Sequence, residues 1–317
     1  MNDFTNLRER DQITWSSRSP CRRGGIPGAN RVVGWLAKGE KEDVPRTEAT
    51  QSTPALHYER AGDAGPAVLL VMGLGMQGRV WDPQVRDLSA DHRVAFFDNR
   101  GIGKSDALSG RPSILDFASD ALRVADACGF TQFHVVGVSL GGMIAQEIAL
   151  SAKERVTSLT LIATHAGGPF GVTPRLAGLV AFARSFAGPR SQRIRALQDL
   201  LYPKEFLAKV DKAKLDERMK LQVGERAAPR TVVGQLFAVV RHDTRRRLDG
   251  IVAPTLVIRP DRDILVRPTH SNHLARGIRR STLLSVPDAG HGVTFQGAAL
   301  VSDAIRKHVS ETERSLS

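Results

Sequence analysis

The stretch Gly137-Val138-Ser139-Leu140-Gly141 constrains the fold of this 317-residue chain more than any other segment. Residues 133–136, just before it, are mostly apolar and β-branched, which predicts a buried strand. Residues 142–150 are rich in helix formers with apolar positions at helical spacing, which predicts a helix. A sharp turn between the two leaves no room for Cβ atoms two residues before and after the serine, and the terminal glycines remove them. This context favours a nucleophile elbow, with Ser139 as the nucleophile, over an ordinary tight turn.

Short apolar segments alternate with helical patterns on both sides of this turn. Residues 114–128 have the apolar spacing of an amphipathic helix that leads into the strand before the turn. Strands that are apolar throughout and alternate with helices are typical of a mainly parallel sheet covered on both faces. The sequence therefore predicts a doubly wound α/β fold. The other segments with strand character are 55–59, 67–72, 93–97, 156–163, 254–258 and 282–286.

The alternation is interrupted between residues 168 and 250, where helical patterns with basic faces follow one another, as in 191–201 and 204–219. We interpret residues 168–250 as a helical lid inserted into one sheet domain made of residues 54–167 and 251–317. The first 53 residues are rich in Arg, Ser, Gly and Pro and lack periodicity, which is typical of a flexible N-terminal extension.

The net charge of +12 is concentrated in the predicted lid, which carries 17 basic and 8 acidic side chains. A basic segment attracts nucleic acid, anionic lipid or an anionic substrate, but it is more often a solvated helical surface. Aromatic residues make up 5% of the chain and do not alternate with the basic ones, so we expect no nucleic-acid partner. A smaller hypothesis is that Arg241 and residues 245–247 bind a negatively charged substrate.

The composition also bears on the compartment. The two cysteines, Cys21 and Cys128, are too few for a disulfide framework or a cysteine-rich metal site. No apolar run approaches the roughly 20 residues that a membrane helix needs. Acidic residues near the start interrupt any signal-peptide pattern. We therefore expect a cytoplasmic protein without stable membrane insertion, in which Cys128 is a small buried hydrophobe.

A nucleophilic serine needs a base within hydrogen-bond reach and an acid that orients the base. His291 lies in a glycine-flanked loop directly after the last predicted strand. Such a loop lies at the carboxyl edge of the sheet, where the elbow also lies, so His291 is the candidate base. Among the other histidines, His165 follows the strand after the elbow and could line the pocket, but we expect it in a solvated loop, and we expect His242 on a helix surface.

The orienting acid is expected in the loop after the strand at 254–258, which contains Asp261 and Asp263. The chain order Ser…Asp…His suits this architecture, and the position within the loop favours Asp263. Asp261 is better explained by pairing with a neighbouring arginine.

The charge that develops on a carbonyl oxygen during acyl transfer needs preorganised N–H donors. The backbone N–H of Leu140 follows the serine at the start of the predicted helix. The loop after residues 67–72 contains two glycines, which allow close approach of the backbone, and its Leu74 N–H is the second candidate.

Residues 55–308 resemble the α/β-hydrolase superfamily, in its esterase and enol-lactonase-like branch with a lid between the sixth and seventh strands. The resemblance implies a Ser139–His291–Asp263 triad that uses no cofactor and no metal. Two features depart from common patterns: Met72 replaces the histidine that often precedes Gly73, and the elbow serine argues against epoxide hydrolase or haloalkane dehalogenase chemistry. The resemblance is carried by residues 70–75, 98–105, 137–142 and 290–292.

Together these features predict a hydrolase that cleaves a carboxylic ester, lactone or thioester in a small acyl substrate through an acyl-enzyme on Ser139. Carbon–carbon bond hydrolysis and cofactor-free haloperoxidase activity would use the same residues. A ligand-binding protein on a hydrolase scaffold is the alternative from a different class. The oligomeric state is left open.

Overall fold

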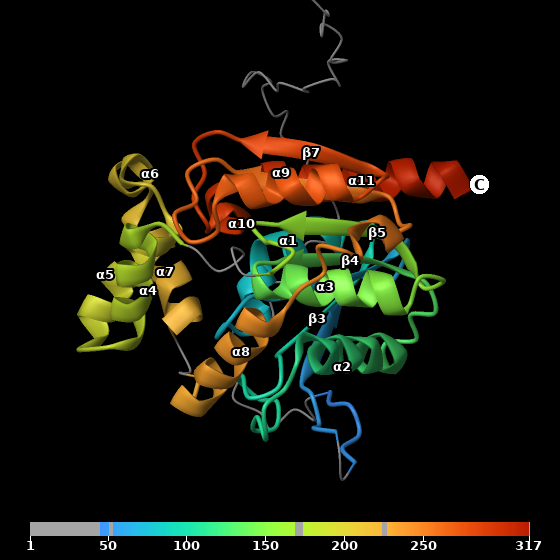
Figure 1. Cartoon of the computed structure of the whole chain (residues 1–317), viewed down its shortest axis with the longest axis horizontal. Helices are drawn as coiled ribbons and strands as arrows, with labels where there is room; N and C mark the ends of the chain where they lie inside the picture. Colours follow the sequence, from blue (N-terminus) through green and yellow to red (C-terminus); the bar gives the residue numbers. More distant parts are fainter. Residues whose placement is uncertain (1–44, 51–52, 169–173, 224–226, 317) are drawn as a thin grey trace, which may run out of the picture. The chain divides into compact units, whose positions relative to one another are not determined.

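The computed structural model describes residues 45–50, 53–168, 174–223 and 227–316. Its centre is a seven-stranded sheet in the order β1-β3-β2-β4-β5-β6-β7 (Figure 1). β1 runs antiparallel to β3, and every other neighbouring pair is parallel, as the unbroken apolar strands predict. The strands are β1 Tyr58–Ala61, β2 Ala67–Val71, β3 Arg93–Phe97, β4 Phe133–Val138, β5 Val156–Ile162, β6 Thr255–Pro260 and β7 Ser281–Val286.

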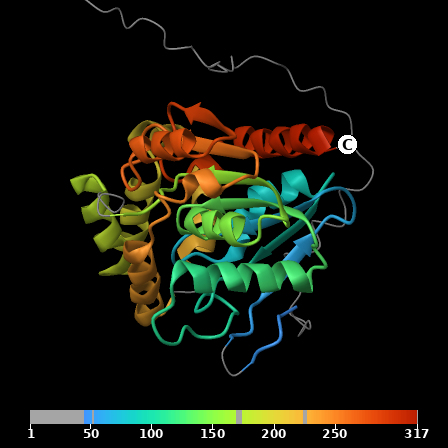
Figure 2. The same cartoon turned by 45° about the vertical axis from the view of Figure 1, so that its right-hand side comes forward.

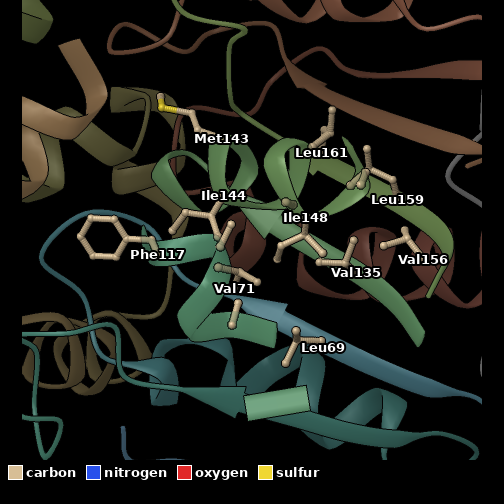
Figure 3. Packing of buried hydrophobic residues seen from close by; sticks show 14 of the residues in the cluster. Leu69, Val71, Phe117, Val135, Met143, Ile144, Ile148, Val156, Leu159 and Leu161 are labelled. Atoms are coloured by element: carbon tan, nitrogen blue, oxygen red, sulfur yellow. The ribbon is translucent and has the colours of Figure 1, made fainter. Parts of the chain in front are cut away.

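Helices cover both faces of this sheet. One face packs against α2 (Ile114–Ala127), α3 (Leu140–Ser151) and α9 (Pro268–Gly277). The other packs against α1 (Asp82–Leu88) and α11 (Ala298–Leu316). Alternate residues of a strand supply the two cores: Leu69 and Val71 of β2 face α2 and α3 (Figure 3), whereas Val68 and Leu70 belong to the opposite core. The doubly wound prediction is confirmed.

Between β5 and β6 the described residues form five α-helices, which we call the helical insertion. The resemblance implied a lid between the sixth and seventh strands, but in this seven-stranded sheet the insertion follows the fifth strand. Figures 1 and 2 show α4 to α7 gathered at one end of the sheet. The helical pattern at 204–219 forms two helices rather than the single one predicted, because Asp211 Oδ1 accepts the N–H groups of Ala213 and Lys214 and starts a new helix there. The five helices are α4 Leu176–Phe186, α5 Arg190–Leu201, α6 Lys204–Lys209, α7 Lys212–Val223 and α8 Pro229–Arg241.

Most of the predicted N-terminal extension, residues 1–44 and 51–52, lies outside the described residues. Residues 45–50 are described, and Thr47 pairs with Leu56 through an N–H···O bond of 2.9 Å and a side-chain contact of 3.0 Å. Cys128 is buried, as expected, and burial raises the pKa of its thiol to about 11. No helix in the described part of the chain combines the length and apolar character that a bilayer crossing requires.

Candidate active site

Ser139 is the single residue between β4 and α3, and its backbone has φ 55° and ψ −119°. This conformation is strained for an L-residue and persists only where the surroundings enforce it. Two contacts to the neighbouring β5 segment do so. The Ser139 N–H donates to the Ile162 carbonyl oxygen at 2.9 Å, and Thr164 Oγ1 donates to the Ser139 carbonyl oxygen at 2.7 Å.

The two glycines of the motif make this turn possible. A Cβ at Gly137 would clash with the backbone of Gly141, and a Cβ at Gly141 would clash with the carbonyl oxygen of Val71 in β2. The turn thus brings the start of α3 against two strands at once. The sequence argument for glycine at these positions rests on the same contacts.

Asp263 and His291 come from loops that follow neighbouring strands, β6 and β7, and the structure brings them together. His291 Nδ1 lies 2.6 Å from Asp263 Oδ2. The other oxygen of this fully buried carboxylate, Oδ1, accepts the N–H groups of Leu265 at 2.8 Å and Val266 at 2.9 Å. These contacts fix the carboxylate, which in turn orients the imidazole with Nε2 as its free nitrogen.

Asp261, the alternative acid, points elsewhere. Its Oδ1 accepts Arg259 Nε at 2.6 Å, and its Oδ2 accepts the Ser285 hydroxyl at 2.7 Å. It therefore pairs with a neighbouring arginine, as expected, and both of its oxygens are engaged at the ends of β6 and β7.

The loop after β2 lies beside the serine. A Cβ built on Gly73 would stand 3.4 Å from Ser139 Cβ and 4.0 Å from its Oγ. Leu74 follows Gly73 in this loop, and Leu140 opens α3. Neither the Leu74 nor the Leu140 N–H donates a hydrogen bond to any residue that the structure describes. Leu140 thus directly follows Ser139, Leu74 follows the glycine that lies beside it, and neither N–H has an acceptor among the described residues.

Two side chains that the sequence argument missed hold this loop. Asn99 Nδ2 donates to the Met72 carbonyl oxygen at 3.1 Å, and Gln235 Oε1 accepts the Gly75 N–H at 2.8 Å. Together they brace the loop that begins at Met72. Gln235 lies 160 positions away on α8, so no local pattern could identify it.

Both predictions for the minor histidines are wrong, because His165 and His242 are buried. His165 Nδ1 accepts the Gly167 N–H at 2.9 Å, and its ring lies 5.6 Å from that of His270. Burial lowers the pKa of His165 to about 3 and that of His242 to about 4, so both rings are neutral at pH 7. Within the described residues, no three His, Cys, Asp or Glu side chains gather in a way that could hold a metal ion.

Two of the arginines proposed to attract an anionic substrate are neutralised by neighbours. Arg247 contacts both oxygens of Glu147, at 2.8 and 2.5 Å, and Arg245 contacts both oxygens of Asp243, at 2.9 and 2.8 Å. Arg241 lies over the Phe237 ring at 5.1 Å.

The helical insertion touches the loops that carry the acid and the base. The Leu201 carbonyl oxygen accepts the Gly292 N–H at 2.8 Å, next to His291. The Ile264 carbonyl oxygen, next to Asp263, accepts the Arg175 N–H at 3.1 Å. Both loops and the loop after β2 also contribute apolar side chains to the core of the insertion, namely Met76, Leu265 and Phe295.

Comparison with known proteins agrees with this architecture. The family model described as the alpha/beta hydrolase fold matches residues 66–298. The chain is 36% identical over 261 residues to the "Putative carbamate hydrolase RutD" of Variovorax paradoxus, covering 79% of this chain and 94% of that protein. It is 35% identical over 242 residues to the protein of the same name from Azorhizobium caulinodans, covering 74% and 88%. The solved enol-lactonase from Burkholderia xenovorans LB400 has the same fold, with a TM-score of 0.73 at 22% identity over 84% of this chain and 100% of that one. The chain therefore belongs to the α/β-hydrolase fold family and is a hydrolase.

Proposed function

We propose that this hydrolase cleaves a carboxylic ester, lactone or thioester through an acyl-enzyme on Ser139. The observation that carries the proposal is the 2.6 Å contact between His291 and the buried Asp263, at the edge of the sheet where β4 ends in the strained Ser139. A serine within reach of a base that an acid orients is the arrangement that activates a hydroxyl.

In the proposed reaction, Ser139 Oγ attacks the substrate carbonyl carbon while His291 Nε2 accepts the hydroxyl proton. Asp263 holds the imidazole and stabilises its protonated form. The N–H groups of Leu140 and Leu74 donate to the oxygen that becomes negative. Collapse of the tetrahedral intermediate expels the alkoxide or thiolate, which takes the proton from His291. Water then attacks the acyl-enzyme with His291 again as base, which releases the acid and restores Ser139.

We propose that the helical insertion is the lid of this site. Its contacts with Gly292 and Ile264, and its packing on the loop after β2, support that role. A cover that excludes water strengthens the electrostatic interactions of the groups beneath it. As a lid, the insertion would also set the size of the substrates that reach Ser139.

Carbamate hydrolysis is the second candidate, and the name of the two relatives at 35 and 36% identity favours it. A carbamate ester presents the same carbonyl to Ser139. Its nitrogen lone pair delocalises into that carbonyl, so attack on the carbamate and release of the carbamoyl-enzyme are intrinsically slower than for an ester. The same residues would serve both reactions, and only the ratio of rates separates them.

The test compares aryl acetates, aryl thioacetates, lactones and N-methyl carbamates, with a shared leaving group where the chemistry allows. The primary proposal predicts a higher kcat/KM for the ester or lactone than for the carbamate, and a mass increase on the Ser139 peptide in quenched samples. The opposite preference, with Ser139 labelled, would favour carbamate hydrolysis. Labelling by a fluorophosphonate at another residue would refute both.

A further inference from the structure

Helix α4 presents three of its large apolar side chains to solvent. Leu176, Leu179 and Val180 are 77, 53 and 40% exposed, and their i, i+3, i+4 spacing places them on one face of the helix. On the other side of the helix Gly178 and Ala181 are buried, and Phe182 packs against the core of the insertion. An ordinary surface helix turns its large apolar residues inward, whereas α4 leaves these three outside.

The exposure does not result from a loosely placed helix. A Cβ on Gly178 would clash with the Ile264 carbonyl oxygen, so α4 packs closely against the loop that carries Asp263. The Arg175 N–H donates to the same carbonyl oxygen at 3.1 Å. Ala181 belongs to the core of the insertion. The inner face of α4 is therefore specified by contacts, and the apolar stripe is left outside.

The charged residues nearest the stripe in the sequence are all arginines, and the first acidic residue after it is Asp199 on α5. Residues 174–198, which span α4 and the first three quarters of α5, contain five arginines and no acidic residue. None of the five forms an ion pair with any residue that the structure describes, unlike Arg245 and Arg247, which follow α8. Arg175 directly precedes Leu176, and Arg184 follows Val180 at i+4, so both border the stripe. The five are Arg175, Arg184, Arg190, Arg193 and Arg195.

We propose that this surface, the α4 docking face, binds the protein to an anionic phospholipid bilayer. The face consists of Leu176, Leu179 and Val180, bordered by Arg175 and Arg184. An apolar stripe flanked by unpaired arginines matches a lipid surface on two counts, since the side chains enter the boundary of the acyl chains while the guanidinium groups meet lipid phosphates. The helix lies in the plane of the membrane and does not cross it.

The charge pattern disfavours the other occupants of such a face. Two copies that met through it would bring arginines against arginines, with no acidic side chain between residues 174 and 198 to pair with them. A nucleic acid would pair with the arginines but would leave the leucines and valine uncovered. Docking would place the bilayer one helix diameter, about 10 Å, from the loop that carries Asp263. The inference does not depend on the reaction proposed above.

The test uses the full-length protein and extruded vesicles of phosphatidylcholine alone or mixed with phosphatidylglycerol. The proposal predicts cosedimentation with the mixed vesicles and none with phosphatidylcholine alone. Binding is expected to fall at least tenfold in Leu176→Ser/Leu179→Ser. In Arg184→Gln it is expected to fall about fivefold, the contribution of one arginine near an anionic surface. Raising sodium chloride from ~0.05 to ~0.5 M should release most of the protein, because it shortens the screening length.

A matched control is available on α8, where Val233 and Val240 are 65 and 60% exposed. Val233→Ser/Val240→Ser removes similar exposed apolar area from the insertion and is expected to bind vesicles like the unmodified protein. Thermal melts of all variants check that the fold is intact. Three outcomes would overturn the proposal: no binding to anionic vesicles, equal loss of binding in the α8 control, or a dimer by light scattering that Leu176→Ser/Leu179→Ser converts to monomer.

Discussion

Helices α3 and α4 are both short, apolar and closely packed through a glycine, yet they treat their large side chains in opposite ways. In α3, Leu140, Met143 and Ile144 are all buried, because the sheet covers one side of the helix and α2 the other. In α4, the side with Gly178, Ala181 and Phe182 is covered, whereas Leu176 on the other side is 77% exposed. The composition of an apolar helix therefore does not tell whether its large side chains are buried within the chain or left exposed.

The largest expected effect is that of Ser139→Ala, at the residue directly before α3. If Ser139, His291 and Asp263 act as a unit, turnover of the best ester should fall by a factor on the order of a million. Steady-state kinetics with active-site titration of the unmodified enzyme measure this loss. Leu176→Ser on α4 is the control and should leave turnover of a soluble ester within about twofold, because an exposed side chain contributes little to the fold. Near-normal turnover in Ser139→Ala would end the proposed mechanism.

The glycine contacts of the two helices can be compared by the same substitution. Gly141→Ala forces a Cβ into the Val71 carbonyl of a central strand that cannot move, so we expect a loss of about 3 kcal/mol or more in the free energy of unfolding. Gly178→Ala meets the Ile264 carbonyl in a loop, which can shift, and alanine favours the helix by about 1 kcal/mol.

We therefore expect Gly178→Ala to cost about 1 kcal/mol or less in urea unfolding, with a larger effect on turnover through the displaced Asp263 loop. Equal destabilisation by the two substitutions would show that α4 is held as rigidly as α3.

The core and the insertion also differ in the acid sensitivity expected of their histidines. Burial lowers the pKa of His134, on β4, to about 3, and that of His242, at the end of α8, to about 4. Both are neutral when folded and regain a pKa near 6.5 when unfolded. The unfolded state therefore binds more protons below pH 6.5, so the stability that each provides is complete above that pH and is lost as the pH falls.

For one such group the slope approaches about 1.4 kcal/mol per pH unit, and it should persist to about pH 4 for His242 and pH 3 for His134. Urea unfolding between pH 7 and pH 4.5 measures it. His242→Gln should reduce the slope of the unfolding free energy against pH by nearly the contribution of one histidine, about 1.4 kcal/mol per pH unit. An unchanged slope would place His242 in solvent, as the sequence alone suggests, and would weaken the packing assigned to the end of α8.

The sheet could be predicted from the sequence more completely than the helical insertion. The sheet, the elbow and the positions of Asp263 and His291 follow from apolar periodicity, glycine spacing and the rule that strand ends meet at one edge. The insertion resists such reasoning, because its contacts are long-range. The helix break at Asp211 depends on one capping carboxylate, and the burial of His242 depends on a neighbour, Glu147, almost 100 positions away. The apolar periodicity of α4 also does not predict which of its faces packs against the core of the insertion.

The last prediction concerns Gln235, the α8 side chain that accepts a hydrogen bond from the loop after β2. Gln235→Met keeps the length of the side chain but removes the oxygen that accepts the Gly75 N–H at 2.8 Å. With that N–H unpaired, the loop bearing Leu74 is held less firmly. Loss of one oxyanion donor lowers kcat by about 10²–10³-fold, and a donor that is only misplaced costs less. We therefore expect kcat to fall about tenfold with little change in KM. Gln235→Glu retains an oxygen acceptor and should recover part of kcat. Hydrogen exchange of the Gly75 amide gives a readout independent of activity: faster exchange in Gln235→Met than in Gln235→Glu is expected, whereas identical exchange would mean that the insertion covers the loop without positioning it.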